Sequence, residues 1–315
     1  METNTEYSSK DVITNLLDIN KPFSPHFLHF FSDISIDNLD LIKKIWTNVD
    51  PTRKYNLLKD IESLMEADTL VSCDDFGNFA LSDDDPHIKS QAIHLFWETS
   101  DIKLISTFID LVKNNPHNEV KQAAVSVLGR FVLLGELDEI PEFSFNQVQN
   151  FLISEFTSIP DINIKQRILE SLGYSSNEKV SQFIKIALKK NEKEWQLAAL
   201  LAISRSVDPK WGKVVMEKLK DFDPDVQIEA IKAAGELEIA SAKNFLFKLL
   251  LSTEPYEEAH LQTVWALAKI GGSDVLELLE EMIESSEDEE EIEALELAIE
   301  SLDLTGGIPS FDLSD

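Results

Sequence analysis

The sequence is poor in the residues that build disulfide-linked or turn-rich folds. Its 315 residues include one cysteine, Cys73, together with ten glycines and eleven prolines. A single cysteine forms no intramolecular disulfide and is typical of a reducing compartment. So few glycines and prolines argue against a turn-rich all-β fold, and the 43% of hydrophobic residues argues against disorder.

Positive charge is also scarce. The chain has 28 Lys and Arg against 58 Asp and Glu, a formal net charge of −30. Nucleic acid and anionic membranes bind cationic surfaces, so this balance disfavours both as partners. No apolar run approaches the ~18 residues that span a membrane. The first ten residues lack the basic start and apolar run of a secretory signal, so we expect a cytoplasmic protein.

What the sequence does contain is an internal repeat. Seven segments place apolar or small residues at i, i+4 and i+8, the buried stripe of a helix. The middle positions of the stripes are 92, 124, 168, 199, 230, 263 and 294, so successive steps are 32, 44, 31, 31, 33 and 31 residues. A second apolar-periodic segment precedes most of these stripes. The repeating unit is therefore predicted to be a pair of helices that buries its apolar faces by stacking.

The pattern D-P-x-[VI]-x-x-x-A, as at Asp223-Pro224, and the Leu-Gly that follows some stripes, as at Leu172-Gly173, resemble HEAT repeats in their bacterial HEAT-like form. The resemblance covers about residues 70–303. It implies an all-α, right-handed superhelix of about seven to eight helical pairs, with the second helix of each pair on the concave face. It implies function only weakly, because many functions share this scaffold.

Three regions depart from the repeat. Residues 1–70 are predicted to be a helical N-terminal cap, including a possible divergent repeat, and residues 71–303 the solenoid. The 44-residue step holds about twelve extra residues, and Gly135 and Pro141 predict an inserted loop near 133–146. Residues 304–315 are predicted to be a flexible acidic tail.

Charge is distributed unevenly along the chain. Between Asp274 and Asp303 there are 14 acidic residues and no Lys or Arg, which predicts either a solubilising helical cap or a docking site for a basic partner. Between Lys179 and Lys220 there are ten basic residues against four acidic ones. That excess of six positive charges could seat an anionic group or could be a fluctuation on outer helix faces.

Catalytic and metal-binding motifs are missing from the sequence. His26 and His29 lie one helical turn apart, but no nearby set of Cys or carboxylate residues completes a metal site. Phosphate-binding glycine loops and G-x-S-x-G are absent. The chain has no His-Glu dipeptide, whereas the HEAT-like deoxyhypusine hydroxylases hold iron with His-Glu pairs. We therefore predict no cofactor, metal or catalytic residue, with a phycobilin-lyase-like or DNA-glycosylase-like enzyme as the alternative.

Stacking should align equivalent positions of successive repeats. One predicted row, just past the stripe, consists of Glu98, Arg130, Tyr174, Arg205, Glu236, Lys269 and Glu300. Tyr and Arg are common anchors of protein interfaces. We therefore predict a non-catalytic binding or assembly scaffold whose protein partner contacts Arg130, Tyr174, Arg205 and Trp211. The alternative for the two arginines is local pairing with neighbouring acids.

Overall fold

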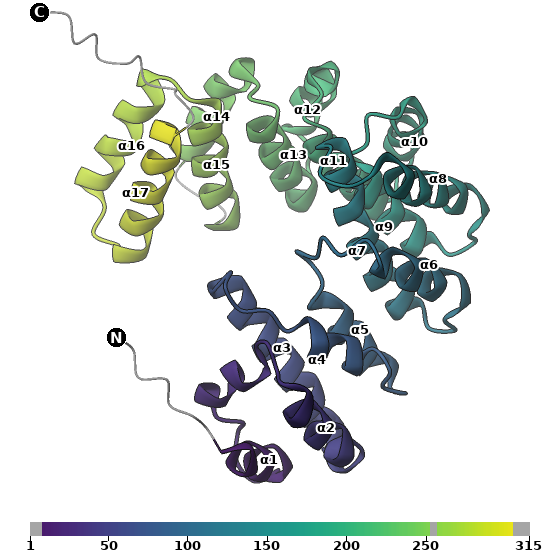
Figure 1. Cartoon of the computed structure of the whole chain (residues 1–315). Helices are drawn as coiled ribbons and strands as arrows, with labels where there is room; N and C mark the ends of the chain where they lie inside the picture. The colour runs from purple at the N-terminus through teal and green to yellow at the C-terminus, as the bar shows by residue number, and fades with distance from the viewer. Residues whose placement is uncertain (1–7, 253–256, 305–315) are drawn as a thin grey trace, which may run out of the picture. The chain divides into compact units, whose positions relative to one another are not determined.

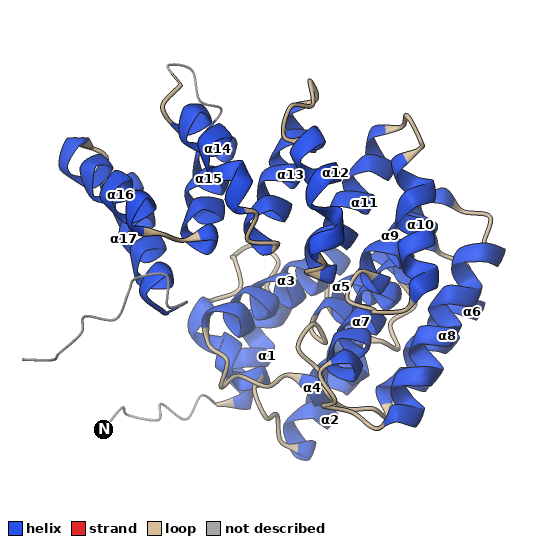
Figure 2. Cartoon of the chain, turned by 90° about the horizontal axis from the view of Figure 1, so that it is seen from above, coloured by secondary structure: helices blue, strands red, loops and turns tan. Residues whose placement is uncertain are grey.

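The computed structural model describes residues 8–252 and 257–304, and every regular element in these ranges is a helix (Figure 2). Contacts divide the chain into two compact units, residues 1–171 and 172–315. The first unit contains the helices α1 Ser9–Leu17, α2 Ile36–Ile45, α3 Pro51–Ala67, α4 Asp74–Ala80, α5 Pro86–His94, α6 Leu104–Asn114, α7 Asn118–Glu136 and α8 Glu142–Ser158, the 3₁₀ helices Pro25–Phe31 and Trp46–Asn48, and nearly all of α9 Ile162–Leu172.

The second unit alternates shorter and longer helices, as Figure 1 shows. Its elements are α10 Glu178–Leu188, α11 Lys193–Ser206, α12 Gly212–Lys218, α13 Pro224–Glu236, α14 Lys243–Leu250, α15 Glu257–Ile270, α16 Ser273–Ser285 and α17 Glu289–Leu304, with 3₁₀ turns at Pro209–Trp211 and Ala240–Ala242. Each even-numbered helix packs on the helix that follows it, and the odd-numbered helices pack on one another. The predicted all-α fold of stacked helical pairs is therefore confirmed.

The predicted stripes are the cores of the second helices. Of their 21 positions, only Glu290 and Ala294 at the C-terminal end are not buried. Asp85 and Asp223 begin α5 and α13 as expected, because their carboxylates accept hydrogen bonds from main-chain N–H groups of the first turn and a proline follows each.

Glycine lets consecutive second helices approach closely. A Cβ atom built on Gly235 of α13 would lie 2.7 Å from Cα of Ala266 in α15, and one built on Gly173 would lie 2.7 Å from Cα of Ala202 in α11. Both distances are far below van der Waals contact. Glycine at this position of the repeat, after Leu172 in one case and after Ala234 in the other, therefore marks where the backbones of neighbouring second helices meet.

The N-terminal helices share one core with the first regular repeat. A single cluster of buried side chains runs from Val12 to Leu95 and includes Phe31, Trp46 and Phe76. The ring centroids of Phe31 and Phe76 are 4.6 Å apart. Residues of the predicted N-terminal cap therefore pack on the first regular repeat, and the first compact unit extends to Ser171.

The inserted loop predicted near 133–146 is wrong. Residue 136 ends α7 and residue 142 begins α8, so most of the extra residues lengthen two helices. Gly135 lies in the last turn of α7, where an added Cβ atom would clash with the Phe145 ring. Pro141 immediately precedes α8, where its missing N–H costs no hydrogen bond. The predicted tail lies outside the described residues, apart from Leu304, the last residue of α17.

Candidate functional site

The repeat register defines one exposed face on the second helices of the second unit. Relative to the middle of each stripe, the positions one before, two after and six after are spaced i, i+3 and i+7, so they share one side of the helix. We call the partly or fully exposed residues at these positions the ladder face; they are Leu201, Arg205, Glu229, Lys232, Glu236, Gln262, Trp265, Lys269, Glu293, Glu296 and Glu300.

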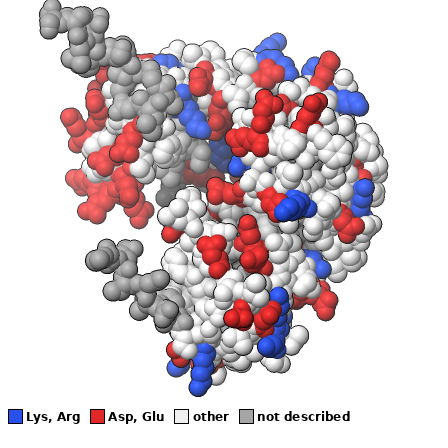
Figure 3. Space-filling model, viewed as in Figure 1, with Lys and Arg blue, Asp and Glu red and all other residues white. Residues whose placement is uncertain are grey.

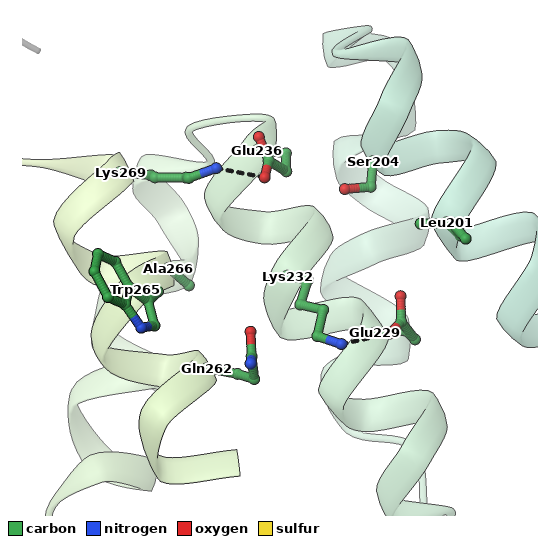
Figure 4. A pocket seen from close by; sticks show the side chains of 9 residues that line it. All are labelled: Leu201, Ser204, Glu229, Lys232, Glu236, Gln262, Trp265, Ala266 and Lys269. Atoms are coloured by element: carbon green, nitrogen blue, oxygen red, sulfur yellow. Dashed lines mark hydrogen bonds and ion pairs between the residues drawn. The ribbon is translucent and has the colours of Figure 1, made fainter. Parts of the chain in front are cut away.

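A groove crosses the ladder face between α11 and α15 (Figure 4). Its volume is about 410 Å³. The lining combines apolar side chains with polar and charged ones: Leu201, Ser204, Glu229, Lys232, Glu236, Gln262, Trp265, Ala266 and Lys269. An apolar floor with a few polar groups is typical of a surface that binds another molecule.

Every cation in the groove already has a carboxylate partner. Lys232 Nζ lies 2.8 Å from Glu229 Oε1 on the same helix. Lys269 forms an ion pair with Glu236, which joins α15 to α13 across the groove (Figure 4). The second oxygen of Glu229, Oε2, is buried and has no hydrogen-bond partner among the described residues. Both lysines that line the groove are therefore neutralised by carboxylates of the same unit.

Two pairs of neighbours in the row predicted from the sequence are in direct contact. The Arg205 guanidinium lies 5.0 Å from the centroid of the Tyr174 ring, within the range of a cation–π interaction, and Glu236 pairs with Lys269. These four residues belong to the second unit. Arg130 lies in the first unit on α7, half-buried, and its Nε has no hydrogen-bond partner among the described residues.

Trp211 does not fit the surface role predicted for it. Its side chain is only 4% exposed, so it is part of the core and not of a binding face. It ends the 3₁₀ turn that begins with Pro209, and the N-cap Asp208 accepts a hydrogen bond from the main-chain N–H of Lys210 at 3.0 Å.

The charge asymmetry of the sequence is visible on the surface. Acidic side chains gather over α16 and α17 (Figure 3). Part of the basic segment Lys179–Lys220 is neutralised by acids that follow it in sequence: Lys193 pairs with Asp223 at 3.2 Å and with Asp225, and Lys218 with Asp221 at 2.8 Å. Hydrogen bonds from Lys193 to Asp225 and Asp223 raise the pKa of its ammonium group.

No cluster of three His, Cys, Asp or Glu residues suited to a metal ion occurs within residues 8–252 and 257–304. In the same ranges, no helix is long and apolar enough to cross a membrane. Burial raises the pKa of the Cys73 thiol to about 12, with Asp74 and Asp33 adding to the effect. The buried thiol is therefore protonated at neutral pH and a poor nucleophile.

Several residues that build the groove lie outside the row predicted from the sequence, which has one position per repeat. Lys232 and Trp265 occupy the same register, two residues after the stripe centre, and Glu229 and Gln262 share another. The residues four and seven positions before each member of the predicted row share its face of the helix, so including these positions in the sequence analysis would have identified them.

These features define a helical-repeat protein with an exposed ladder of side chains on its second helices. Residues 212–300, which span α12 to most of α17, match the family model of HEAT repeats. No curated protein sequence matches the chain.

Among solved structures, the chain is similar to YibA of E. coli, with 12% identity, a TM-score of 0.45 and coverage of 88% of this chain and 96% of YibA. The comparison with human deoxyhypusine hydroxylase gives 13% identity and a TM-score of 0.36, and it covers 94% of this chain and 97% of the hydroxylase. The comparison with Kap95p bound to RanGDP gives 14% identity and a TM-score of 0.41, and it covers 93% of this chain and 42% of Kap95p.

Proposed function

We propose that the protein is a non-catalytic scaffold that binds a protein partner through the ladder face of its second unit. The observation that carries the proposal is the groove between α11 and α15, where Leu201 and Trp265 expose apolar surface beside paired charges. A half-buried tryptophan in a groove is a common energetic anchor of an interface.

The shape of the face favours an extended segment of the partner. The ladder residues come from consecutive second helices that pack side by side, so a chain lying across them contacts one helix after another. Tyr174 and Arg205 continue the face beyond the groove, and their cation–π contact holds the guanidinium over the ring. An extended chain can accept contacts along this entire line, whereas a small molecule would use only one step of it.

The test compares Trp265→Ala with a matched control, Trp97→Ala. Trp97 is 39% exposed and lies in the first unit, outside the ladder face of the second. Each protein is immobilised, exposed to lysate of its native cells, and the retained proteins are identified by mass spectrometry.

We expect a set of proteins retained by the wild type and by Trp97→Ala but lost with Trp265→Ala, while circular dichroism shows that all three are folded. Identical retained sets for all three proteins would contradict the proposal. Replacing Arg205 with Glu should also weaken capture, because the reversed charge loses its place over Tyr174.

A further inference from the structure

The partner of the ladder face can be described chemically, because the face changes character from α11 to α17. In register with Gln262, Trp265 and Lys269 of α15, helix α17 places Glu293, Glu296 and Glu300, all exposed. Helices α15 and α17 pack on each other. His260 of α15 also approaches Glu291 of α17, with 3.0 Å between Nε2 and Oε1. The acidic residues therefore extend the groove's own face.

The positive charges of the groove do not neutralise these carboxylates. Lys269, the nearest ladder cation in register, pairs with Glu236 of α13 (Figure 4). Helix α15 packs on both α13 and α17, and this ion pair links it to α13. Lys232 pairs with Glu229 within α13. Over α13, α15 and α17 the ladder face holds five carboxylates, Glu229, Glu236, Glu293, Glu296 and Glu300, and two lysines, which leaves three uncompensated negative charges.

The arrangement on α17 opposes helix stability. Glu296 and Glu300 are four residues apart, so their like charges repel on one face of the helix. Glu300 also lies in the C-terminal half, where the helix dipole disfavours negative charge. A cationic side chain placed between the two carboxylates would relieve both effects, and the groove next to them supplies an apolar anchor point.

Resting on the proposed function, we infer that the partner segment is extended and basic, with an apolar side chain in the groove beside Trp265 and Lys or Arg over Glu296 and Glu300. Packed helices are about 8–10 Å apart. An extended chain advances about 3.3 Å per residue. The basic residue therefore follows or precedes the apolar one by about three positions.

The experiment selects random twelve-residue peptides displayed on phage against the immobilised full-length protein. Enriched peptides should carry an aliphatic or aromatic residue with Lys or Arg three or four positions away on one side. Enrichment of acidic peptides, of peptides without this charge preference, or of none at all would overturn the inference.

One enriched peptide, fluorescently labelled, is then measured by anisotropy against variants whose folding is checked by circular dichroism. The double variant Glu296→Lys/Glu300→Lys should bind at least tenfold more weakly. The control Glu280→Lys/Glu284→Lys has the same charge change and the same spacing on exposed positions of α16. It should change affinity less than twofold, and an equal loss in both variants would overturn the inference in favour of general attraction to a −30 protein.

The variant Trp265→Ala distinguishes a failure of this inference from a failure of the proposed binding function. If Trp265→Ala weakens binding tenfold while Glu296→Lys/Glu300→Lys does not, the binding face is correct and the basic partner is wrong. If Trp265→Ala leaves the affinity unchanged, the peptide binds elsewhere and the proposed function fails as well.

Discussion

Replacing Gly235 with alanine tests how closely the second helices must pack. Gly235 lies in α13 with Ala266 of α15 directly opposite. The added Cβ would lie 2.7 Å from Ala266 Cα and 3.1 Å from Ala266 Cβ. Because the nearest atom belongs to the backbone, no side-chain rotation removes the clash. Helices α13 and α15 have to separate, and this alters the groove that they line.

Two opposing effects set the magnitude. Overpacking of a tight interface costs about 1–3 kcal/mol. Alanine is better than glycine in a helix interior by about 1 kcal/mol. Near the C-terminal end of α13 the gain is smaller than in the middle, so we expect a net loss of stability of about 1–2 kcal/mol.

Gly212→Ala is the matched control. Gly212 begins α12, and a Cβ atom added there would have Ile239 Cδ1 as its nearest neighbour at 3.9 Å, an ordinary contact. The same substitution should therefore leave stability unchanged or raise it by up to about 1 kcal/mol.

Urea unfolding followed by circular dichroism measures the change in stability. A repeat chain with two units need not unfold in one step, so hydrogen exchange of peptides from α13 and α15 locates the effect. Exchange should accelerate there in Gly235→Ala and not in Gly212→Ala. A Gly235→Ala protein as stable as the wild type would refute the close-packing argument.

Three further predictions concern stability and reactivity outside the ladder face. Asp83→Ala should destabilise the first unit by about 3–5 kcal/mol in urea unfolding, since it strands the buried Lys54 ammonium, 2.8 Å from the carboxylate, and removes the acceptor of the Trp46 indole N–H. Burial raises the pKa of Asp83, but hydrogen bonds from Lys54 and Trp46 outweigh this effect and leave the pKa below its ordinary value. The stabilisation by the ionised carboxylate should therefore be present above the ordinary Asp pKa of about 3.9 and be lost as pH falls through the lower folded value. Acid titration of Asp83→Ala should not show this loss. Cys73, buried and with its pKa raised to about 12, should react with a thiol reagent at about pH 8 only after unfolding, and rapid modification of the folded protein would contradict its burial. Val207→Gly should raise stability by about 1 kcal/mol, because this exposed β-branched residue ends α11 with φ at 45°, a conformation that glycine adopts without strain, and a lower melting temperature would show that the valine side chain makes a stabilising contact.

The sequence predicted those parts of the fold that depend on local periodicity. Stripe residues such as Ala124, Ala199 and Ala230 recur at the spacing of a helix and at a nearly constant interval, so burial and stacking follow from the pattern alone. The same register predicted that Glu236 and Lys269 are neighbours, and they form an ion pair. Glycine and proline misled the interpretation between α7 and α8, because both residues also occur at helix ends.

Only the tertiary structure decided which residues line the surface groove and which face the core. Trp211 ends a 3₁₀ turn and Trp265 lies within α15, yet the first is buried and the second lines the groove. The sequence determined the helical pairs, because hydrophobic spacing along one helix is a local property. The groove, the partners of its lysines and the unpaired oxygen of Glu229 depend on how neighbouring helices approach each other, and side chains distant in sequence set that approach.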